Sequence, residues 1–176
     1  MSKRLKKQDW VSAGLQALAK DGPSALKADR LAAKLDVSRG SFYWHFYNLA
    51  AFHTAVLDGW FEIATSGVIE EIEKLPWGAA RLDRLLEIAF SADRSMERGI
   101  RAWGAQSDLV SDRVDQLDGV RVAYLTKLIS EMGWSADEAR DKAVLLYLSN
   151  LGRLLVCDDL AQSVSLSMLQ DSAKRR

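Results

Sequence analysis

The stretch from Lys27 to Phe46 decides how this chain folds, and it reads KADRLAAKLDVSRGSFYWHF. It holds two short segments with helical spacing of apolar residues, joined at Asp36, where a left-handed backbone favours Gly, Asn or Asp. Small Ala32 is placed where the two helices would cross. The apolar positions predict one shared core made of Leu31, Leu35, Val37, Phe42 and Phe46. This is the pattern of a helix-turn-helix, whose second helix enters the DNA major groove.

Outward from this stretch, the chain of 176 residues continues as helices. We expect caps at Ser38, Asn48 and Ser135, the last in a capping box with Glu138, and a helix end at Gly133. The spacing predicts helices over residues 9–20, 28–35, 39–46, 48–74, 79–93, 96–106, 108–132, 136–157 and about 160–169. The fold class is therefore all-α. A three-helix helix-turn-helix domain at residues 1–48 is expected to precede a helical ligand-binding and dimerisation bundle at residues 49–176.

Charge is distributed unevenly along the sequence. The chain carries 24 basic and 24 acidic residues, yet residues 1–50 hold nine basic against four acidic side chains, a net charge of +5. The remainder carries −5. A basic N-terminal part on an acidic body indicates that one end meets a polyanion. Lys3, Arg4, Lys6 and Lys7 are a candidate basic arm, although an untethered basic terminus is often merely solvated.

The composition of the chain indicates the cellular compartment of the protein. No stretch approaches the ~20 apolar residues of a membrane helix, and the N-terminus lacks the pattern of a signal peptide. The single Cys157 cannot form an internal disulfide, and its apolar neighbours predict a buried small residue in a reducing compartment. We expect a cytoplasmic protein without membrane contact.

The segment VSRGSFYWHF at residues 37–46 resembles the recognition helix of the TetR family of bacterial transcriptional regulators. That helix reads roughly Val-Ser-(Lys or Arg)-Gly-(Thr or Ser)-Leu-Tyr-(Trp or His)-(His or Tyr)-Phe. The resemblance covers about residues 10–57 and implies a DNA-binding domain. Residues 100–103, 124–125, 133 and 138–140 look like the ligand-binding end of one subset of the family, which names no ligand.

The candidate DNA contacts lie at and around this second helix. Arg39 can reach guanine or phosphate, Gly40 permits a close approach, and the helix N-terminus favours a phosphate. The resemblance implies that Tyr43 and His45 mainly position the DNA backbone. The alternative for the polar aromatics is that they belong to the core. The full set is Lys27, Ser38, Arg39, Gly40, Ser41, Tyr43, Trp44, His45 and Asn48.

Three positions depart from the family pattern. Lys27 replaces the usual threonine cap, which removes an acceptor but leaves a cation able to meet phosphate. Leu49 stands where a phosphate-contacting lysine is common, and Asp36 replaces the turn glycine. These changes raise the question of whether DNA binding is weakened.

Enzyme chemistry finds no support in the residues. A helical di-iron site needs Glu-x-x-His pairs, but Phe42 and Ala50 stand three residues before His45 and His53. One cysteine excludes a Cys-rich zinc site, and neither a phosphate loop nor a nucleophile elbow is present. We expect no enzyme, no cofactor and no metal, and a structural role for His53.

The middle of the chain is expected to hold a small apolar effector. A site for such an effector needs an apolar cavity with a few polar side chains that bind its polar groups. For each candidate residue below, the alternative is ordinary packing in the core. The candidates are Trp60, Phe61, Phe90, Met96, Arg101, Trp103 and Tyr124.

The helix ending near Cys157 has almost no polar face, so it must be covered on all sides. A partner subunit is the natural cover, with a central core helix of one subunit as the alternative. In the TetR family the last two helices pair in a four-helix dimer interface. The candidate interface residues are Leu148, Leu151, Gly152 and Leu155.

These expectations combine into one functional hypothesis. The chain is expected to be a homodimeric, sequence-specific DNA-binding regulator that binds a two-fold operator on double-stranded DNA. We expect a repressor that a small apolar effector releases. The alternative is a helical protein-interaction module that has lost DNA binding.

Overall fold

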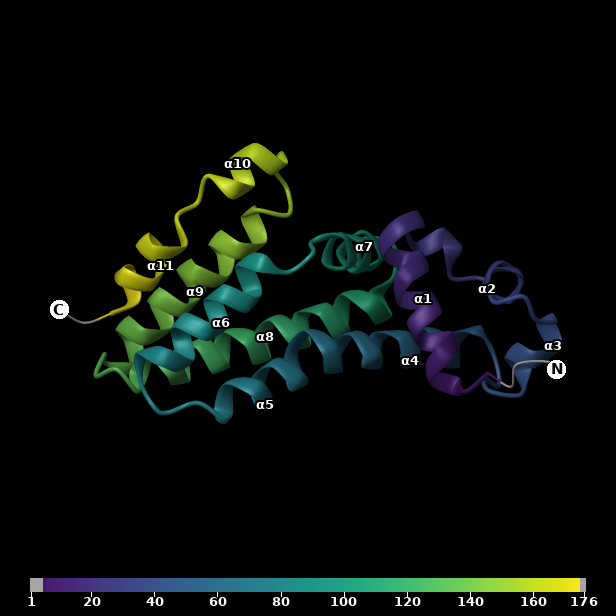
Figure 1. Cartoon of the computed structure of the whole chain (residues 1–176), viewed down its shortest axis with the longest axis horizontal. Helices are drawn as coiled ribbons and strands as arrows, with labels where there is room; N and C mark the ends of the chain where they lie inside the picture. The colour runs from purple at the N-terminus through teal and green to yellow at the C-terminus, as the bar shows by residue number, and fades with distance from the viewer. Residues whose placement is uncertain (1–4, 175–176) are drawn as a thin grey trace. The chain divides into compact units, whose positions relative to one another are not determined.

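The computed structural model describes residues 5–174, and within this range every regular element is helical. The chain divides into two compact units. Unit 1 contains the described residues up to Ala64 together with Arg94–Val114, and unit 2 contains Thr65–Asp93 together with the described residues from Asp115 onward. Figure 1 follows the helices in chain order. The all-α prediction is confirmed.

Unit 1 begins with the predicted helix-turn-helix. Its helices are α1 (Lys7–Asp21), a 3₁₀ turn (Pro23–Ala25), α2 (Ala28–Lys34), α3 (Arg39–Tyr43), α4 (Leu49–Phe61), α7 (Ser95–Gly104) and the start of α8 (Asp108–Ser130). Asp36 adopts a φ of 55°, the left-handed conformation that the turn requires. Asn48 caps α4 by accepting a hydrogen bond from the amide of Ala51. Ser38 occupies the N-cap position of α3, but its side chain makes no capping bond, so that prediction was wrong.

Aromatic rings pack α1 and α3 against α4. Phe42 is completely buried, and its ring meets Trp10 of α1 edge-on at 5.4 Å and Phe52 of α4 at 5.3 Å. Phe46 packs on Phe52 at 5.0 Å. Gly14 of α1 makes this close approach possible, because a Cβ there would lie 2.7 Å from the Phe52 ring. The predicted core residues Leu31, Phe42 and Phe46 are buried, whereas Leu35 and Val37 are half-buried.

Helix α7 packs directly on α1. A Cβ on Gly99 would lie 2.8 Å from the carbonyl oxygen of Leu18, so the two backbones touch at this glycine. His53 of α4 joins the same region, with Nε2 at 3.2 Å from the carbonyl oxygen of Leu26 and its ring edge-on to Trp103 of α7. The expected structural role of His53 agrees with these contacts.

Acid should destabilise unit 1 through His53. Burial lowers the pKa of His53, and the hydrogen bond to Leu26 only partly opposes this. The unfolded chain then binds the proton more readily, so stability is full above the ordinary histidine pKa of about 6.5 and falls as pH drops toward the lowered value. His53→Gln keeps a donor for Leu26 but does not titrate. We expect its melting temperature to depend less on pH between about 7.5 and 5.5 than that of the wild type. His45→Gln is the matched control, and a flatter profile for this control alone would contradict the assignment.

Unit 2 begins inside a continuous helix. Residues 49–73 are helical throughout, as predicted, but Glu62–Ser66 form a π-helical segment between α4 and α5 (Gly67–Glu73). The further elements are α6 (Ala79–Ser91), the rest of α8, α9 (Ala136–Gly152), α10 (Asp158–Gln162) and α11 (Leu166–Ala173). The capping box of Ser135 and Glu138 is confirmed, and Gly133 has the positive φ expected after a helix.

Three predictions for the end of the chain were wrong. The helix predicted to reach Cys157 ends at Gly152, where Arg153 turns its buried guanidinium back toward other parts of unit 2. It donates to the carbonyl oxygens of Ala161 and Phe90. Cys157 is exposed at the N-terminus of α10, not buried. The single last helix predicted at 160–169 is two helices, α10 and α11.

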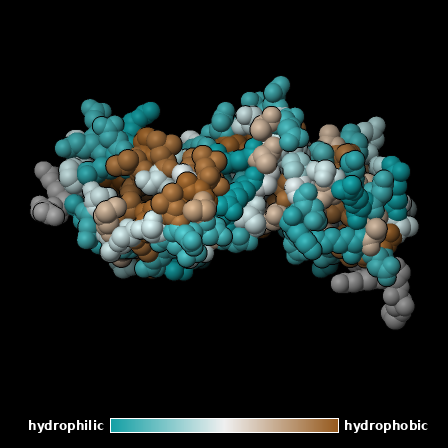
Figure 2. Space-filling model, turned by 90° about the horizontal axis from the view of Figure 1, so that it is seen from above, coloured by the Kyte–Doolittle hydropathy of each residue, from teal (hydrophilic) through white to brown (hydrophobic). Residues whose placement is uncertain are grey.

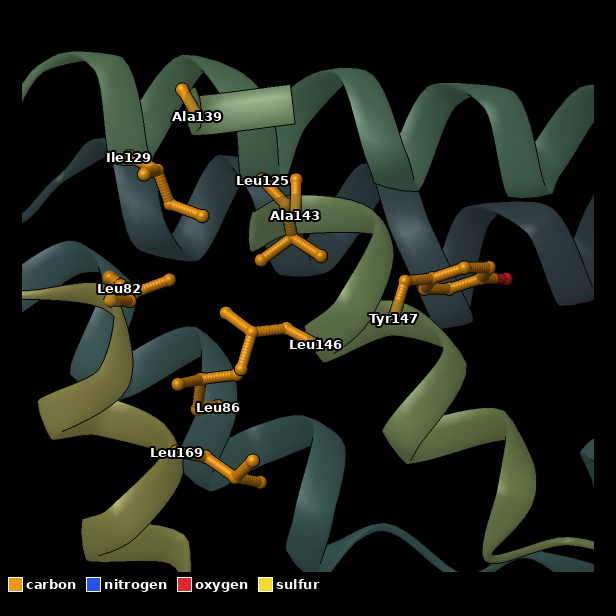
Figure 3. Packing of buried hydrophobic residues seen from close by; sticks show 10 residues of the cluster. Leu82, Leu86, Leu125, Ile129, Ala139, Ala143, Leu146, Tyr147 and Leu169 are labelled. Atoms are coloured by element: carbon orange, nitrogen blue, oxygen red, sulfur yellow. The ribbon is translucent and has the colours of Figure 1, made fainter. Parts of the chain in front are cut away.

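Helix α9 is apolar on two sides with different surroundings. On one side Ala139, Ala143 and Leu146 are buried. Together with Leu82 of α6, Ile129 of α8 and Leu169 of α11 they form the core of unit 2, which Figure 3 shows. The other side carries leucines that are exposed to solvent. Figure 2 shows apolar side chains gathered on the surface of unit 2. Within the described residues, no helix is long and apolar enough to cross a membrane.

Candidate nucleic-acid interface

The candidate interface is the recognition segment, which we define as residues 37–48. Its helix α3 has only five residues, far fewer than a helix needs to be stable alone, so packing must hold it. Phe42 and Phe46 supply that packing by pointing into the aromatic core. The intervening side chains are therefore turned outward.

Large aromatic side chains are exposed on this segment. Trp44 is 89% exposed and Tyr47 is 92% exposed, and Tyr43 is also exposed. His45 is half-buried. The core alternative is thus wrong for Tyr43 and Trp44. Exposed aromatic rings with polar tips suit a surface that is covered by a partner.

Arg39 lies at the start of α3 and is held by two neighbours. Its Nε is 3.3 Å from Oδ1 of Asp29 on α2, and its Nη2 donates to the Tyr43 hydroxyl at 3.1 Å. These contacts raise the pKa of Arg39, the bond to Tyr43 most of all. Both members of the ion pair stay largely exposed, with side-chain exposures of 63% for Arg39 and 69% for Asp29.

Lys27 and Lys7 are candidate phosphate-binding cations, whereas Leu49 supplies no charge. Lys27, at the N-cap of α2, is exposed and its side chain makes no capping bond, which leaves its ammonium group available for phosphate. Lys7 of α1 places its ammonium 5.5 Å from the centre of the Phe46 ring. Lys7 thus brings positive charge next to the turn that leads to Leu49. Of the predicted basic arm, Lys3 and Arg4 lie outside the described residues.

Gly40 has no packing reason to be glycine. A Cβ there would meet only Oγ of Ser38, at an ordinary 3.7 Å. Gly40→Ala should therefore leave the fold intact and, by helix propensity, stabilise it by up to about 1 kcal/mol. We expect the same variant to bind DNA more weakly, because the added methyl group separates the helix from the duplex. Thermal unfolding and DNA titration of one sample test both, and undiminished DNA binding would show that the DNA does not approach Gly40.

The domain built from these helices has recognisable relatives. Residues 11–52 match the family model for bacterial regulatory proteins of the tetR family. These residues are therefore similar to the DNA-binding domain of TetR-family regulators. No curated protein matches the chain in sequence.

Solved structures of TetR-like proteins share the fold. The reduced form of NemR from E. coli superimposes with a TM-score of 0.75 at 18% identity, over 95% of this chain and 93% of that one. FadR from Bacillus subtilis, in complex with stearoyl-CoA, gives 0.69 at 14% identity over 96% and 95%. A tetR-family transcriptional regulator from Streptomyces coelicolor gives 0.64 at 17% identity over 98% and 78%. At these identities the likeness concerns the fold.

Most of the predicted DNA contacts lie close together in the sequence, at and around α3. Arg39, Gly40, Ser41 and Tyr43 belong to α3 and Trp44 is its C-cap, while Ser38, His45 and Asn48 flank the helix. Sequence reasoning missed Tyr47 and Asp29. An aromatic residue between a core phenylalanine and a capping asparagine was the available signal for Tyr47. The signal for Asp29 was weaker: an acidic residue on the first helix of the motif, ten residues before an arginine on the second.

The seven candidate effector residues are divided between the two units. Trp60, Phe61, Met96, Arg101 and Trp103 belong to unit 1, and Phe90 and Tyr124 belong to unit 2. Trp60 and Trp103 are buried, and Arg101 pairs with Glu97 on its own helix. In unit 2, Phe90 lies under the Arg153 guanidinium, whereas Tyr124 donates to Glu73 in a different core cluster.

Candidate metal ligands do not converge in the part of the chain that the structure describes. Among residues 5–174, no three His, Cys, Asp or Glu side chains come together as a metal site would need. The carboxylate of Glu73 is instead occupied by cations and a phenol. It binds Arg81 and Lys127 at 2.8 Å each and Tyr124 at 3.0 Å, which lowers its pKa.

Proposed function

We propose that this chain is a homodimeric repressor that binds a two-fold operator through paired recognition segments and is released by a small apolar effector. Residues 1–48 serve as the DNA-binding part and residues 49–176 as the effector-binding and dimerisation part. Because its target is chromosomal DNA, such a repressor acts in the cytoplasm. The carrying observation is the exposure of Arg39, Tyr43, Trp44 and Tyr47 in a domain that matches the tetR family model.

Loss of DNA binding is the weaker alternative. A protein-interaction module would keep α3 as scaffold, and its outward side chains would have no reason to be donors and aromatics. Here the outward face retains a guanidinium, a phenol and an indole. Lys7 also provides a cation beside the turn where Leu49 lacks one.

Dimerisation is supported by the uncovered side of unit 2. On α9, Leu145, Leu148 and Gly152 follow one another at helical spacing and are all exposed. Gly152 has open space where a Cβ would be, so a second helix can approach closely there. Leu155, Leu160 and Met168, which follow α9 in the chain, are further exposed apolar side chains. Leu151, by contrast, packs against the core of its own chain. We propose that a second copy covers this face through an isologous contact.

The effector proposal rests on aromatic and sulfur-containing side chains of α4 and α7. Trp60, Met96 and Trp103 offer an apolar surround, and Arg101 offers a charge for a polar group on the effector. The FadR relative holds stearoyl-CoA, a ligand with a long apolar chain. We propose an effector whose larger part is apolar.

Binding of the purified protein to the intergenic DNA upstream of its own gene tests the proposed function. We expect one or more protected sites with two-fold symmetry and an affinity far above that for scrambled DNA of the same composition. The affinity should fall steeply as salt rises, since phosphate contacts release counterions. Equal affinity for both DNAs would contradict the proposal and favour the interaction module. Release by apolar compounds is then screened on the identified site.

A further inference from the structure

The guanidinium of Arg39 is held by two neighbouring side chains. An arginine side chain carries five N–H donors in a planar fork. Asp29 faces the Nε–H and the Tyr43 hydroxyl accepts one Nη2–H. The guanidinium carbon also lies 5.7 Å from the centre of the Tyr43 ring. Three N–H groups therefore remain, two on Nη1 and one on Nη2.

Those three groups are the ones that base recognition uses. An arginine pairs with guanine when two adjacent N–H groups point at the O6 and N7 atoms in the major groove. With Nε occupied by Asp29, the adjacent pair that stays available is Nη1 and Nη2. Holding a flexible side chain in this orientation also reduces the entropy that is lost on binding.

The contribution of the Asp29–Arg39 ion pair to the stability of the fold is small. Both side chains are more than half exposed, and ion pairs in such positions contribute little to stability. The pair nevertheless joins the two helices of the motif at the point where α3 begins. Its effect should therefore appear in recognition and hardly at all in unfolding.

We propose that Asp29 is a positioning residue for sequence recognition, which aims Arg39 at a guanine in each half-site. Tyr43 supports the same orientation from the other side, and its hydroxyl keeps a proton that it can donate to a phosphate. The inference rests on the proposed function, because it requires that the recognition segment reads DNA.

The test begins with the full-length wild-type protein and a pool of randomised duplexes, from which the preferred half-site is selected. Competition titrations then measure how strongly each protein prefers guanine at each position. We expect Arg39→Ala to abolish the preference at one position. Asp29→Asn should reduce that preference about two- to fivefold, with an unchanged melting temperature. In the Arg39→Ala background, Asp29→Asn should change no preference further.

Asp36→Asn is the matched control, since it removes the same charge from the same motif and asparagine tolerates the left-handed turn. It should leave every base preference unchanged. An Asp29→Asn variant that binds all duplexes more tightly with unaltered preference would overturn the inference, because Asp29 would then only repel phosphate. The inference would also be overturned if Asp29→Asn reduced a base preference as strongly in the Arg39→Ala background as in the wild type, since Asp29 would then contact the base itself. A wild-type protein that enriches no sequence would instead overturn the proposed function, and the inference with it.

Discussion

Leu148→Asp should convert the protein to folded monomers and reduce its operator affinity by at least about a hundredfold. Leu148 is 57% exposed on α9, so an aspartate there is solvated in the single chain and costs the fold little. In the proposed interface the same carboxylate would be buried without a partner, which is strongly unfavourable. A monomer offers one recognition segment instead of two, although the DNA-binding part is unaltered. Light scattering gives the mass, circular dichroism the helicity, and a titration the affinity.

Leu109→Asp is a closely matched control. Leu109 on α8 is also 57% exposed, so both variants change the same chemistry at the same exposure. We expect Leu109→Asp to remain dimeric. If Leu148→Asp stays a dimer and still binds the operator, the partner surface lies elsewhere and the exposed face of α9 needs another explanation.

Phe42→Ala should unfold the recognition segment. The side chain is completely buried, and its ring contacts four other rings, those of Trp10, Tyr43, Phe46 and Phe52. Truncating a buried phenylalanine costs about 3–5 kcal/mol, and a five-residue helix has no stability of its own to offset this. We expect amide hydrogen exchange in residues 28–46 to become fast and DNA binding to be lost.

Phe42→Leu provides the graded comparison for this position. Leucine is the residue that the TetR pattern carries here, and it still fills most of the volume. Its cost should be well below that of alanine, with DNA binding retained. Slow exchange throughout residues 28–46 in Phe42→Ala would mean that other contacts suffice to hold α3.

Much of the fold was predictable because its signals are local. The φ of Asp36, the Asn48 cap and the Ser135 capping box each depend on a few neighbouring residues, which the sequence displays directly. The end of α9 was not predictable in this way. The apolar run continues to Cys157, but the helix stops where buried Arg153 reaches carbonyl groups of α6 and α10, and such long-range partners leave no local pattern.

The candidate site was likewise predictable only where its sequence signals are local. Spacing placed Arg39, Gly40 and Tyr43 on the outer face of α3, and the structure agrees. It did not reveal Asp29, whose partnership with Arg39 arises only when α2 and α3 cross. The effector residues stay a prediction, because cavities form between helices from side chains that are far apart in sequence.

The short helix α3 separates two kinds of constraint. Phe42 and Phe46 are buried and stabilise the fold by packing in its core. Arg39, Tyr43 and Trp44 point outward and are exposed. Mutations of the outward set should therefore alter which operator is chosen at little cost in foldability. Over evolutionary time, a duplicated copy of such a gene can acquire a new target through a few surface exchanges while its buried rings stay the same.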